Sequence, residues 1–507
     1  MGKKNILYLS AIIIFAAGLR ILALTTQGSF WFDEIFTVYF AGLDLPEMFS
    51  FIIYDHNPPV HFLLIHYWLK LFGSNEIIVR LSSLIFGLAN IGLIYLVGQQ
   101  LFSKRIGQLA GFLGAISLFQ IYYSVEARMY SLLLFLTLLS FYFFWRLLNQ
   151  YKFKNLILYL GFTVLALLTH LTGLFVLLIQ NAFVLYLYFQ KELKLNFKKW
   201  FFGQLAVVIV FGIWFGPMVY LKLQEGLNIL QGWYFTQTTR HFFLENLNNF
   251  FIFGRYQEFI NLILQIIILG LLILAVIRIS RPDKRFIVDF DRSGQIILLL
   301  LWLFLPLAVG FIFNVNVTKY YIIASPALYL LAAKGLDNLK LTKKYLALFL
   351  IIVFLLIWPL APHNVTAAWP EVIQYIEDQS TDNSKVIANP FILTLPLKFY
   401  DLQGVTLEGF YPVDDEPNLD LRIVKKNWFP QITEDNAEKL QQATYNFDRI
   451  LLVTFYVDQS RQDDFVKKWF LKNGWQITDE RLFPADVGVI TLIRSQTVNS
   501  RSSAYFF

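Results

Sequence analysis

The sequence contains no cysteine among its 507 residues and carries little charge. The absence of cysteine excludes disulfide bonds, thiolate metal sites and cysteine nucleophiles. Charged residues make up 15% of the chain, whereas a soluble globular protein carries about 25%. With 57% hydrophobic residues and a mean hydropathy of +0.55, the composition predicts a polytopic α-helical membrane protein that lies in a lipid bilayer.

Several motif classes are also missing. The Lys and Arg residues are scattered among loops instead of lining one face, so we expect no nucleic-acid partner. The sequence shows no internal repeat of fixed period. Its C-terminal part shows no nucleophile elbow, glycine-rich phosphate loop or metal-ligand cluster, so it is assigned a support or acceptor-binding role.

Charge divides the chain into two parts. Residues 1–360 have a net charge of +13 and residues 361–507 a net charge of −6. A basic membrane part fits cytoplasmic loops that face anionic lipid, and an acidic remainder fits a water-soluble domain. The predicted domains are a transmembrane domain over 1–360 with a first outer loop at 26–75, an extracytoplasmic α/β domain over 361–494, and a flexible tail over 495–507.

Apolar runs predict about eleven transmembrane helices, with the N-terminus in the cytoplasm because Lys3 and Lys4 precede the first run. A cleaved signal peptide is the alternative for this first run, but no clear small-x-small cleavage site follows it. A shorter aromatic stretch at 60–72 predicts an interfacial or re-entrant helix. The predicted spans cover residues 5–24, 77–97, 106–119, 131–148, two helices within 155–190 separated at 169–172, 201–220, 259–277, 296–313, 320–333 and 346–360.

The charge distribution supports this topology. About 20 Lys and Arg residues fall at the inner loops and helix ends, as the positive-inside rule requires. We therefore expect a multi-pass protein of the plasma membrane, the inner membrane in bacteria, with its C-terminal domain outside. Five cations fall on the outer side: Arg128, Lys222, Arg240, Arg255 and Lys319.

The C-terminal part changes character after residue 360. Short apolar strands alternate with amphipathic helices, which is typical of an α/β domain. The predicted helices cover 371–378 and 437–443, and the predicted strands cover 385–388, 449–454 and 487–493.

The first outer loop is acidic. No Lys or Arg occurs between Arg20 and Lys70, where five carboxylates are found: Asp33, Glu34, Asp44, Glu47 and Asp55. In a mostly apolar chain, carboxylates beside aromatic residues at the water interface indicate a functional site. We interpret Asp33 as a catalytic base and Glu34 as its acidic partner. The alternatives are a solvated loop end, or an acidic pair that holds Mg²⁺ or Mn²⁺.

A metal-independent sugar transfer to a hydroxyl needs a base, cations that stabilise the departing phosphate, and an apolar groove for a lipid donor. Arg128, beside Glu126, is the first candidate cation, and Lys319, Arg255 and His56 are others. Glu126 and Arg128 can equally be a structural ion pair. His170 can equally be a hydrogen-bonded interface residue, and a metal pair of histidines lacks a third ligand of suitable spacing.

Four motifs then occur in order along the first part of the chain. They are Trp31-Phe32-Asp33-Glu34; Asp55-His56-Asn57-Pro58-Pro59-Val60 leading to Trp68-Leu69-Lys70-Leu71-Phe72-Gly73; Arg80-Leu81; and Tyr123-Ser124-Val125-Glu126-Ala127-Arg128-Met129-Tyr130. In this order they resemble the GT-C glycosyltransferases, specifically the protein O-mannosyltransferase and aminoarabinose-transferase superfamily. The resemblance covers residues 1–180, continues through Thr318-Lys319-Tyr320-Tyr321, and fades in the C-terminal part.

The resemblance implies a polyprenyl-phosphate sugar donor, inversion at the anomeric carbon and an extracytoplasmic acceptor hydroxyl on a lipid, glycan or protein. Asp33 matches the catalytic aspartate of the family and Glu34 its acidic neighbour. Asn57 stands where relatives carry a basic residue that faces the donor phosphate, so His56 or Arg128 takes that charge. The predicted donor-binding residues are His56, Asn57, Glu126, Arg128, Tyr130, His170, Arg255, Lys319 and Tyr320. No metal site is predicted and no cofactor is required, with a divalent cation left open.

Two other functions fit parts of the pattern. A transporter or flippase of lipid-linked sugars would also have many spans and outer charges, but it more often has ionisable residues at the membrane midplane and paired broken helices. Most charges in this chain lie at span ends. A non-catalytic membrane protein that binds glycans is the second alternative. If the protein is the glycosyltransferase, we expect Asp33 and Arg128 to lie on the same side of the membrane.

Overall fold

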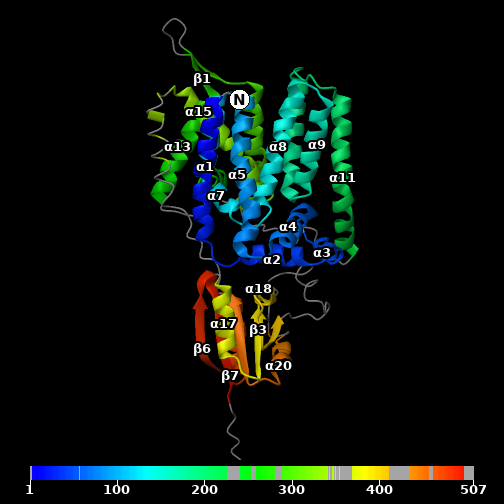
Figure 1. Cartoon of the computed structure of the whole chain (residues 1–507), viewed down its shortest axis with the longest axis vertical. Helices are drawn as coiled ribbons and strands as arrows, with labels where there is room; N and C mark the ends of the chain where they lie inside the picture. The colour runs from blue at the N-terminus through cyan, green and yellow to red at the C-terminus, as the bar shows by residue number, and fades with distance from the viewer. Residues whose placement is uncertain are drawn as a thin grey trace, which may run out of the picture. The chain divides into compact units, whose positions relative to one another are not determined.

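The structure is a computed structural model. It describes residues 3–55, 57–224, 240–252, 258–280, 287–340, 342, 345–346, 349, 353, 368–409, 434, 437–455 and 461–495. The chain forms two compact units (Figure 1). The membrane unit comprises Met1–Thr26 and Phe40–His363, and the C-terminal unit comprises Gln27–Tyr39 and Asn364–Phe507.

The membrane unit is mainly helical, as predicted. Figure 1 shows α1, α5, α8, α9 and α11 running alongside one another. Its elements are α1 (Lys3–Thr25), α3 (Leu45–Ile52), α4 (Pro59–Phe72), α5 (Glu76–Leu101), α6 (Lys104–Ile116), α7 (Leu118–Ser124), α8 (Tyr130–Asn149), α9 (Phe153–Leu167), η1 (Leu171–Gly173), α10 (Leu174–Phe189), α11 (Phe197–Gln224), α12 (Phe242–Asn249), α13 (Glu258–Val276), β1 (Ile277–Ser280), β2 (Ile287–Phe290), α14 (Gly294–Ile312), η3 (Thr318–Ala324) and α15 (Ser325–Asn338).

Seven helices in the described part of the chain are long and apolar enough to cross a membrane, or eight if the bent pair of α6 and α7 is one span. The protein is therefore a multi-pass membrane protein, but the predicted count of eleven spans is not confirmed. Helix α9 has 15 residues and α15 has 14, both short for a full crossing. Most of the predicted span at 346–360 lies outside the described residues.

The predicted span at 320–333 has a different structure. Residues Thr318–Ala324 form the 3₁₀ helix η3, and α15 starts only at Ser325. Pro326 occupies the first turn of α15. Because proline lacks an N–H and has a fixed φ, it favours the first turn of a helix over its interior. The chain therefore changes helix type immediately before this residue.

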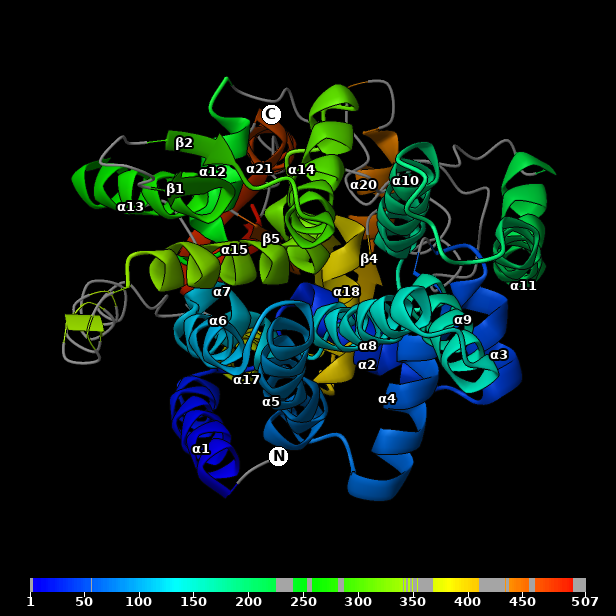
Figure 2. The ribbon, with the colours of Figure 1, turned by 90° about the horizontal axis from the view of Figure 1, so that it is seen from above.

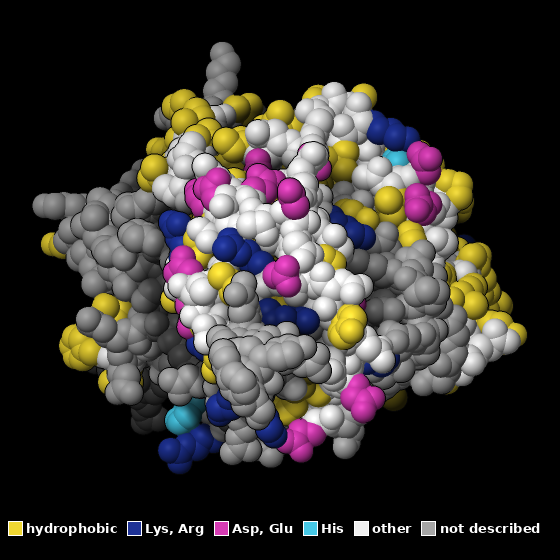
Figure 3. All heavy atoms as spheres, turned by 90° about the horizontal axis from the view of Figure 1, so that it is seen from below, with side chains coloured by type: hydrophobic (Ala, Val, Ile, Leu, Met, Phe, Trp, Pro, Cys, Tyr) yellow, Lys and Arg dark blue, Asp and Glu magenta, His cyan; other side chains and the backbone are white. Residues whose placement is uncertain are grey.

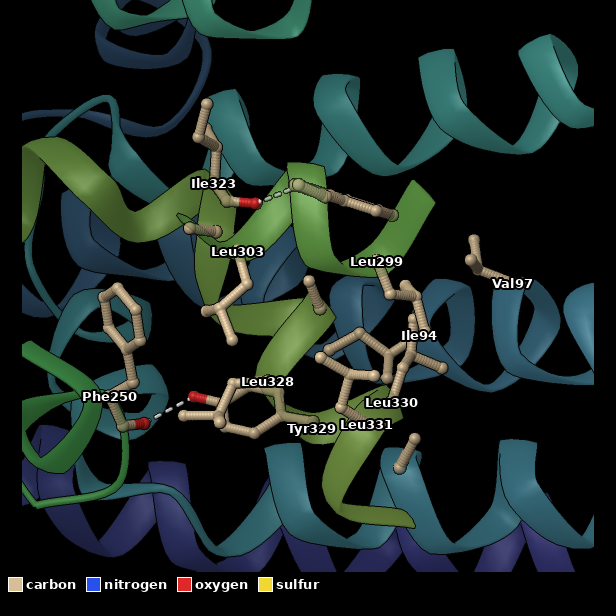
Figure 4. Close-up of a cluster of buried hydrophobic side chains, with 14 of the residues drawn as sticks. Ile94, Val97, Phe250, Leu299, Leu303, Ile323, Leu328, Tyr329, Leu330 and Leu331 are labelled. Carbon is tan, nitrogen blue, oxygen red and sulfur yellow. Dashed lines mark hydrogen bonds between the residues drawn. The ribbon is translucent and has the colours of Figure 1, made fainter. Parts of the chain in front are cut away.

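Helix α15 is the centre of the membrane unit. Figure 2 shows it flanked by α6 and α7 on one side and by α13 and α14 on the other. Leu328, Leu330 and Leu331 are fully buried, and Figure 4 shows Leu330 and Leu331 beside Ile94. The hydroxyl of Tyr329 donates a hydrogen bond to the backbone carbonyl of Phe250 over 2.6 Å.

The chain bends by 66° between α6 and α7. A bend removes helical hydrogen bonds, and in an apolar surrounding the protein itself must replace them. The backbone N–H of Leu118 donates to the carbonyl of Phe251 over 2.8 Å. The side chain of Ser117 donates to the carbonyl of Phe250, also over 2.8 Å. The segment after α12 therefore supplies the acceptors that the bend needs.

Arg20 of α1 also donates hydrogen bonds to residues on both sides of the bend. This residue is fully buried, and its guanidinium group donates to the carbonyl of Ala115 over 3.2 Å and to the Ser124 hydroxyl over 3.0 Å. Ser124 ends α7, directly before the loop that carries Glu126 and Arg128. Arg20 of α1 thus bonds to the last turn of α6 and to the last residue of α7. Helix α5 also lies close to α7, because a Cβ at Gly87 would lie 2.2 Å from the Ser124 hydroxyl oxygen.

The C-terminal unit is an α/β fold, as predicted. Its five-stranded sheet has the order β4-β3-β5-β7-β6, in which β3 pairs parallel with β4 and β5, and β7 pairs antiparallel with β5 and β6. The predicted strands and helices are found at their expected places. The elements are β3 (Ser384–Asn389), β4 (Thr406–Gly409), β5 (Arg449–Phe455), β6 (Trp475–Phe483), β7 (Val487–Arg494), α2 (Phe32–Gly42, shared with the membrane unit), α17 (Trp369–Gln379), α18 (Thr394–Phe399), α20 (Glu438–Thr444) and α21 (Arg461–Lys472).

Strands β4 and β6 were not predicted from the sequence. Both are edge strands, and β6 exposes most of its residues, including Glu480 and Leu482. Edge strands commonly carry charged side chains that prevent pairing with other chains, so their hydrophobic pattern is weak. Figure 3 shows acidic and basic side chains interspersed on the surface of this unit. Such a surface fits contact with water.

The close approach of α5 to α7 gives a first prediction. Gly87→Ala places a methyl group against Ser124, and we expect it to lower the stability of the folded protein by about 1–3 kcal/mol, the usual cost of overpacking. Gly92→Ala is the matched control on the same helix, because no atom lies within 4 Å of its Cβ. Thermal unfolding in detergent measures both. Equal melting temperatures for the two variants would contradict the packing described.

Candidate active site

Helix α2 carries the acidic pair of the first outer loop. Glu34 is 1% exposed, and its carboxylate accepts a hydrogen bond from the backbone N–H of Trp31 over 3.2 Å. Trp31 directly precedes the helix and Glu34 is its third residue, so this is the acidic half of a capping box. Asp33 is half-buried in the first turn, where the helix dipole favours a carboxylate. The two acids therefore have different surroundings, and Glu34 has a structural partner.

Helix α4 begins at the second proline of the Asn57-Pro58-Pro59 motif, so the predicted helix at 60–72 is confirmed. The side-chain amide of Asn57 donates to the carboxylate of Asp55 over 2.8 Å. The N–H of Val60 donates to the carbonyl of Leu168 over 3.0 Å. This last bond joins the start of α4 to the chain break that contains His170. His56 lies outside the described residues.

The loop between α7 and α8 holds Glu126 and Arg128 inside the membrane unit, at 5% and 6% exposure. The Arg128 N–H donates to the Glu126 carbonyl over 2.7 Å, which makes a tight turn. On the α8 side, Ser131 donates to the Tyr123 carbonyl over 2.7 Å, and Asn90 of α5 donates to the Ser131 carbonyl over 3.0 Å. The loop is thus held by several backbone bonds, as a buried loop needs to be.

His61 of α4 lies beside this loop and was not among the predicted site residues. It is 1% exposed, and neither ring nitrogen makes a hydrogen bond of normal geometry within the described residues. Burial, followed by the positive charge of Arg128, lowers the pKa of His61 to about 3, although the backbone of Ala127 favours the charged form slightly. The ring is therefore neutral at physiological pH.

His170 lies in the polar break between α9 and η1, where the sequence predicted one. Its Nδ1 accepts a hydrogen bond from the Thr172 backbone N–H over 3.2 Å and lies 2.8 Å from the Thr172 hydroxyl oxygen. A nitrogen that accepts from an N–H carries no proton itself, so the neutral ring holds its proton on Nε2. His170 can therefore act as a hydrogen-bond donor through Nε2.

Four predicted residues, His170 among them, lie together here. The ring centroids of Tyr130 and Tyr320 lie 5.9 and 5.6 Å from that of His170. The ammonium group of Lys319 lies 5.7 Å from the centroid of the Tyr130 ring, within the range of a cation–π interaction. Tyr130 begins α8, while Lys319 and Tyr320 come from η3. We call these four residues the aromatic cluster.

A cavity of about 480 Å³ adjoins the aromatic cluster. Tyr320 and Thr172 line it, together with apolar side chains of α10 and α14 such as Phe175, Leu178 and Val309, and with residues of η1, η3 and the loop after α14. A cation and a polar ring at the edge of an apolar cavity suit an amphipathic ligand with a charged head and a hydrocarbon tail.

The predicted site residues are thus partly brought together. In the membrane unit, Val60 at the start of α4 bonds to Leu168, two residues before His170, and Glu126 and Arg128 lie in the loop that leads to Tyr130. Asp33 and Glu34 belong to the C-terminal unit, so the expected arrangement of Asp33 with Arg128 stays a prediction. Arg255 lies outside the described residues. Among the described residues, no group of three or more His, Asp or Glu side chains is placed to hold a metal ion.

A family model described as dolichyl-phosphate-mannose-protein mannosyltransferase matches residues 56–227, which contain α4 through α11. ArnT from Cupriavidus metallidurans is similar in structure, both in its apo state and bound to undecaprenyl phosphate. Each ArnT structure has a TM-score of 0.60 and 14% identity, over 96% of this chain and 97% of that chain. The chain has the GT-C glycosyltransferase fold.

A second GT-C protein agrees. The Archaeoglobus fulgidus oligosaccharyltransferase in complex with Zn and sulfate has a TM-score of 0.51 and 14% identity, over 88% of this chain and 67% of that chain. No curated protein sequence matches the chain significantly. The shared fold confirms the fold class predicted from the sequence, and the family match over residues 56–227 agrees with the predicted resemblance.

Two buried features of the membrane unit were not predicted from the sequence. One is His61, whose position beside Arg128 depends on how α4 packs. The other is Lys222 of α11, which is 3% exposed and whose charge interacts favourably with that of Asp55. The only signal for Lys222 was its place among the outer cations. The spacing of 167 positions between the two charges gave no sign that they are close.

The lowered pKa of His61 gives a second prediction. A base whose charged form is disfavoured protonates only below its lowered pKa, so the ring is expected to stay neutral from pH 8 down to about pH 4. Nitrogen chemical shifts of ¹⁵N-histidine-labelled protein measure this, with His61→Gln used to assign the signal. A titration midpoint near 6.5, the unperturbed value, would contradict the described environment.

Proposed function

We propose that the enzyme transfers a sugar from a polyprenyl-phosphate donor to an acceptor hydroxyl outside the cytoplasm, with inversion at the anomeric carbon. The observation that carries the proposal is the aromatic cluster at the edge of the apolar cavity, which together suit a lipid phosphate. The undecaprenyl phosphate bound to ArnT, a protein of the same fold, supports the same ligand class.

In this proposal, the membrane unit binds the donor. The isoprenoid chain enters the cavity between α10 and α14, where burial of apolar surface stabilises it. The phosphate lies near Lys319 and the Nε2–H of His170, and Arg128 supplies a further positive charge. These groups stabilise the negative charge that grows on the phosphate as the sugar leaves. Asn57 carries no charge, so its proposed contribution to the site is its hydrogen bond to Asp55.

Asp33 is the proposed general base. Its carboxylate takes the proton of the acceptor hydroxyl while the acceptor oxygen forms a bond to the anomeric carbon. The bond between that carbon and the phosphate oxygen breaks at the same time, so the lipid phosphate leaves with the electron pair. One bond forms on the face opposite the one that breaks, which inverts the anomeric configuration.

The division between the two acids follows from their contacts. Glu34 accepts the Trp31 N–H and stabilises the helix start, whereas Asp33 is the more exposed of the pair. We propose that Glu34 serves Asp33 as a structural neighbour. The proposal needs no metal ion, and the charge distribution of the loops favours a plasma-membrane location with the N-terminus in the cytoplasm and the C-terminal unit outside.

The base assignment gives a third prediction. Asp33→Asn removes the proton acceptor, and we expect transfer to fall by about 10²- to 10⁴-fold. Glu34→Gln keeps an oxygen that can accept the Trp31 N–H, so a much smaller loss is expected. Purified protein added to membranes of a strain that lacks the gene measures transfer, because those membranes supply donor and acceptor.

Asp44→Asn is the matched control, since Asp44 is an exposed residue of the same acidic loop and its side chain makes no capping bond. We expect it to keep the parental rate. Transfer by Asp33→Asn at the parental rate would overturn the base assignment. Mass spectrometry of the product identifies the sugar and the acceptor in the same experiment.

The phosphate assignment gives a fourth prediction. Lys319→Gln removes the ammonium group above the Tyr130 ring, and we expect the affinity for undecaprenyl phosphate to fall about tenfold, or 1.4 kcal/mol. Lys334→Gln is the control, because Lys334 is also a partly buried lysine over an aromatic ring, but it bonds to Asn338 at the far end of α15. Equal affinities of the two variants would place the phosphate elsewhere.

A further inference from the structure

The segment that carries Asp33 belongs to the C-terminal unit, although more than 300 residues separate it from the sheet of that unit. Two hydrogen bonds connect the parts at consecutive residues. The Trp369 N–H donates to the Ser29 hydroxyl over 3.2 Å, and the Phe30 N–H donates to the Tyr400 hydroxyl over 2.8 Å. The chain just before α2 is therefore bonded to α17 and to the end of α18.

Apolar packing surrounds the second bond. Phe30 is fully buried, and its ring packs edge-on against that of Phe399, with the centroids 5.8 Å apart. A buried backbone N–H that loses its acceptor costs about 1–3 kcal/mol. The hydroxyl of Tyr400 therefore stabilises this contact, because it accepts the Phe30 N–H, which is buried away from water.

The two residues before the helix are held in sequence. Tyr400 accepts the N–H of Phe30, and Glu34 accepts the N–H of Trp31. Helix α2 starts at the next residue, and Asp33 is its second. The direction of the Asp33 carboxylate thus depends on where the helix starts and how its first turn is oriented. A displacement of about 1 Å at a reacting group can lower a rate by about 10²-fold.

We propose that Tyr400 is a positioning residue for Asp33, and that the C-terminal unit is part of the catalytic apparatus through this bond. The inference rests on the proposed role of Asp33 as base. It gives the C-terminal unit a defined task, which is to hold the first turn of α2 at the orientation that proton transfer needs. If the C-terminal unit only bound the acceptor, loss of the hydrogen bond from Phe30 to Tyr400 would not change the rate of transfer.

The test compares Tyr400→Phe with the parent in the full chain. Phenylalanine keeps the ring that packs against Phe399 and removes only the oxygen that accepts the Phe30 N–H. We expect transfer in membranes of the deletion strain to fall by about 10- to 100-fold. The affinity for undecaprenyl phosphate should stay within about twofold, because the proposed lipid site is in the membrane unit.

Hydrogen exchange reports on the bond itself. In Tyr400→Phe, the amide of Phe30 is expected to exchange about tenfold faster, while the amides of β5 exchange as in the parent. Ser29→Ala, which removes the acceptor of the Trp369 N–H, is the second variant and should move both readouts in the same direction. Tyr445→Phe is the control, because Tyr445 is 69% exposed on the same unit. It should leave exchange and transfer unchanged.

The outcomes separate this inference from the proposed function. If Asp33→Asn abolishes transfer and Tyr400→Phe keeps the parental rate, the base assignment holds and the positioning role is wrong. If Asp33→Asn keeps the parental rate, the base assignment itself is wrong. A further loss of the residual transfer of Asp33→Asn on adding Tyr400→Phe would also overturn the inference, because a residue that acts only through Asp33 has no effect once that carboxylate is gone.

Discussion

Backbone groups that leave the helical pattern inside an apolar unit need partners from the protein, and much of this structure depends on that requirement. At the bend between α6 and α7, the carbonyls of Phe250 and Phe251 accept from Ser117 and Leu118, and Arg20 donates to Ala115. At the break before α10, His170 and Thr172 bond to each other. Each interruption is thus satisfied by residues from a distant part of the chain or by its own side chains.

The same interruptions provide the site. Regular helices direct their backbone groups along the axis and leave only side chains for a ligand, whereas helix ends and breaks bring short polar segments together. Tyr130 begins a helix, His170 lies in a break, and Tyr320 lies in the 3₁₀ turn before Pro326. The aromatic cluster therefore gathers at the ends of three elements, beside a cavity lined by η1, α10, α14, η3 and the loop between α14 and η3.

The sequence predicted features that depend on local patterns. Long apolar runs indicated the membrane helices, and Thr169 to Thr172 indicated a break because polar residues interrupt such a run. It did not indicate the bend at Ser117, where one serine within an apolar stretch is a weak signal and the partners Arg20, Phe250 and Tyr329 are distant. Strand β6 was missed because an edge strand with charged side chains lacks the alternating pattern.

For the candidate site, too, the sequence predicted residues that stand in local patterns but not the contacts between them. Motif order identified Asp33, Arg128 and Lys319 as candidates and the polar break contained His170, but the contacts of these residues depend on packing that no spacing reveals. His61 and Tyr400 show this most clearly. Neither residue stands in an unusual local sequence, and each gains its importance from one neighbour, Arg128 in one case and the Phe30 amide in the other.

The buried Arg20 also has a consequence for biogenesis. Helix α1 precedes α6 and α7 in the chain, so its guanidinium group enters the bilayer before Ala115 and Ser124 have been synthesised. On insertion scales an arginine costs roughly 2.5–3.5 kcal/mol at the centre of a spanning helix. Arg20 lies in the last third of α1, so its cost is smaller, and the otherwise apolar helix offsets it. Assembly of α1 with α6 and α7 then releases that cost, so this contact favours late docking of the first helix onto the helices that follow it.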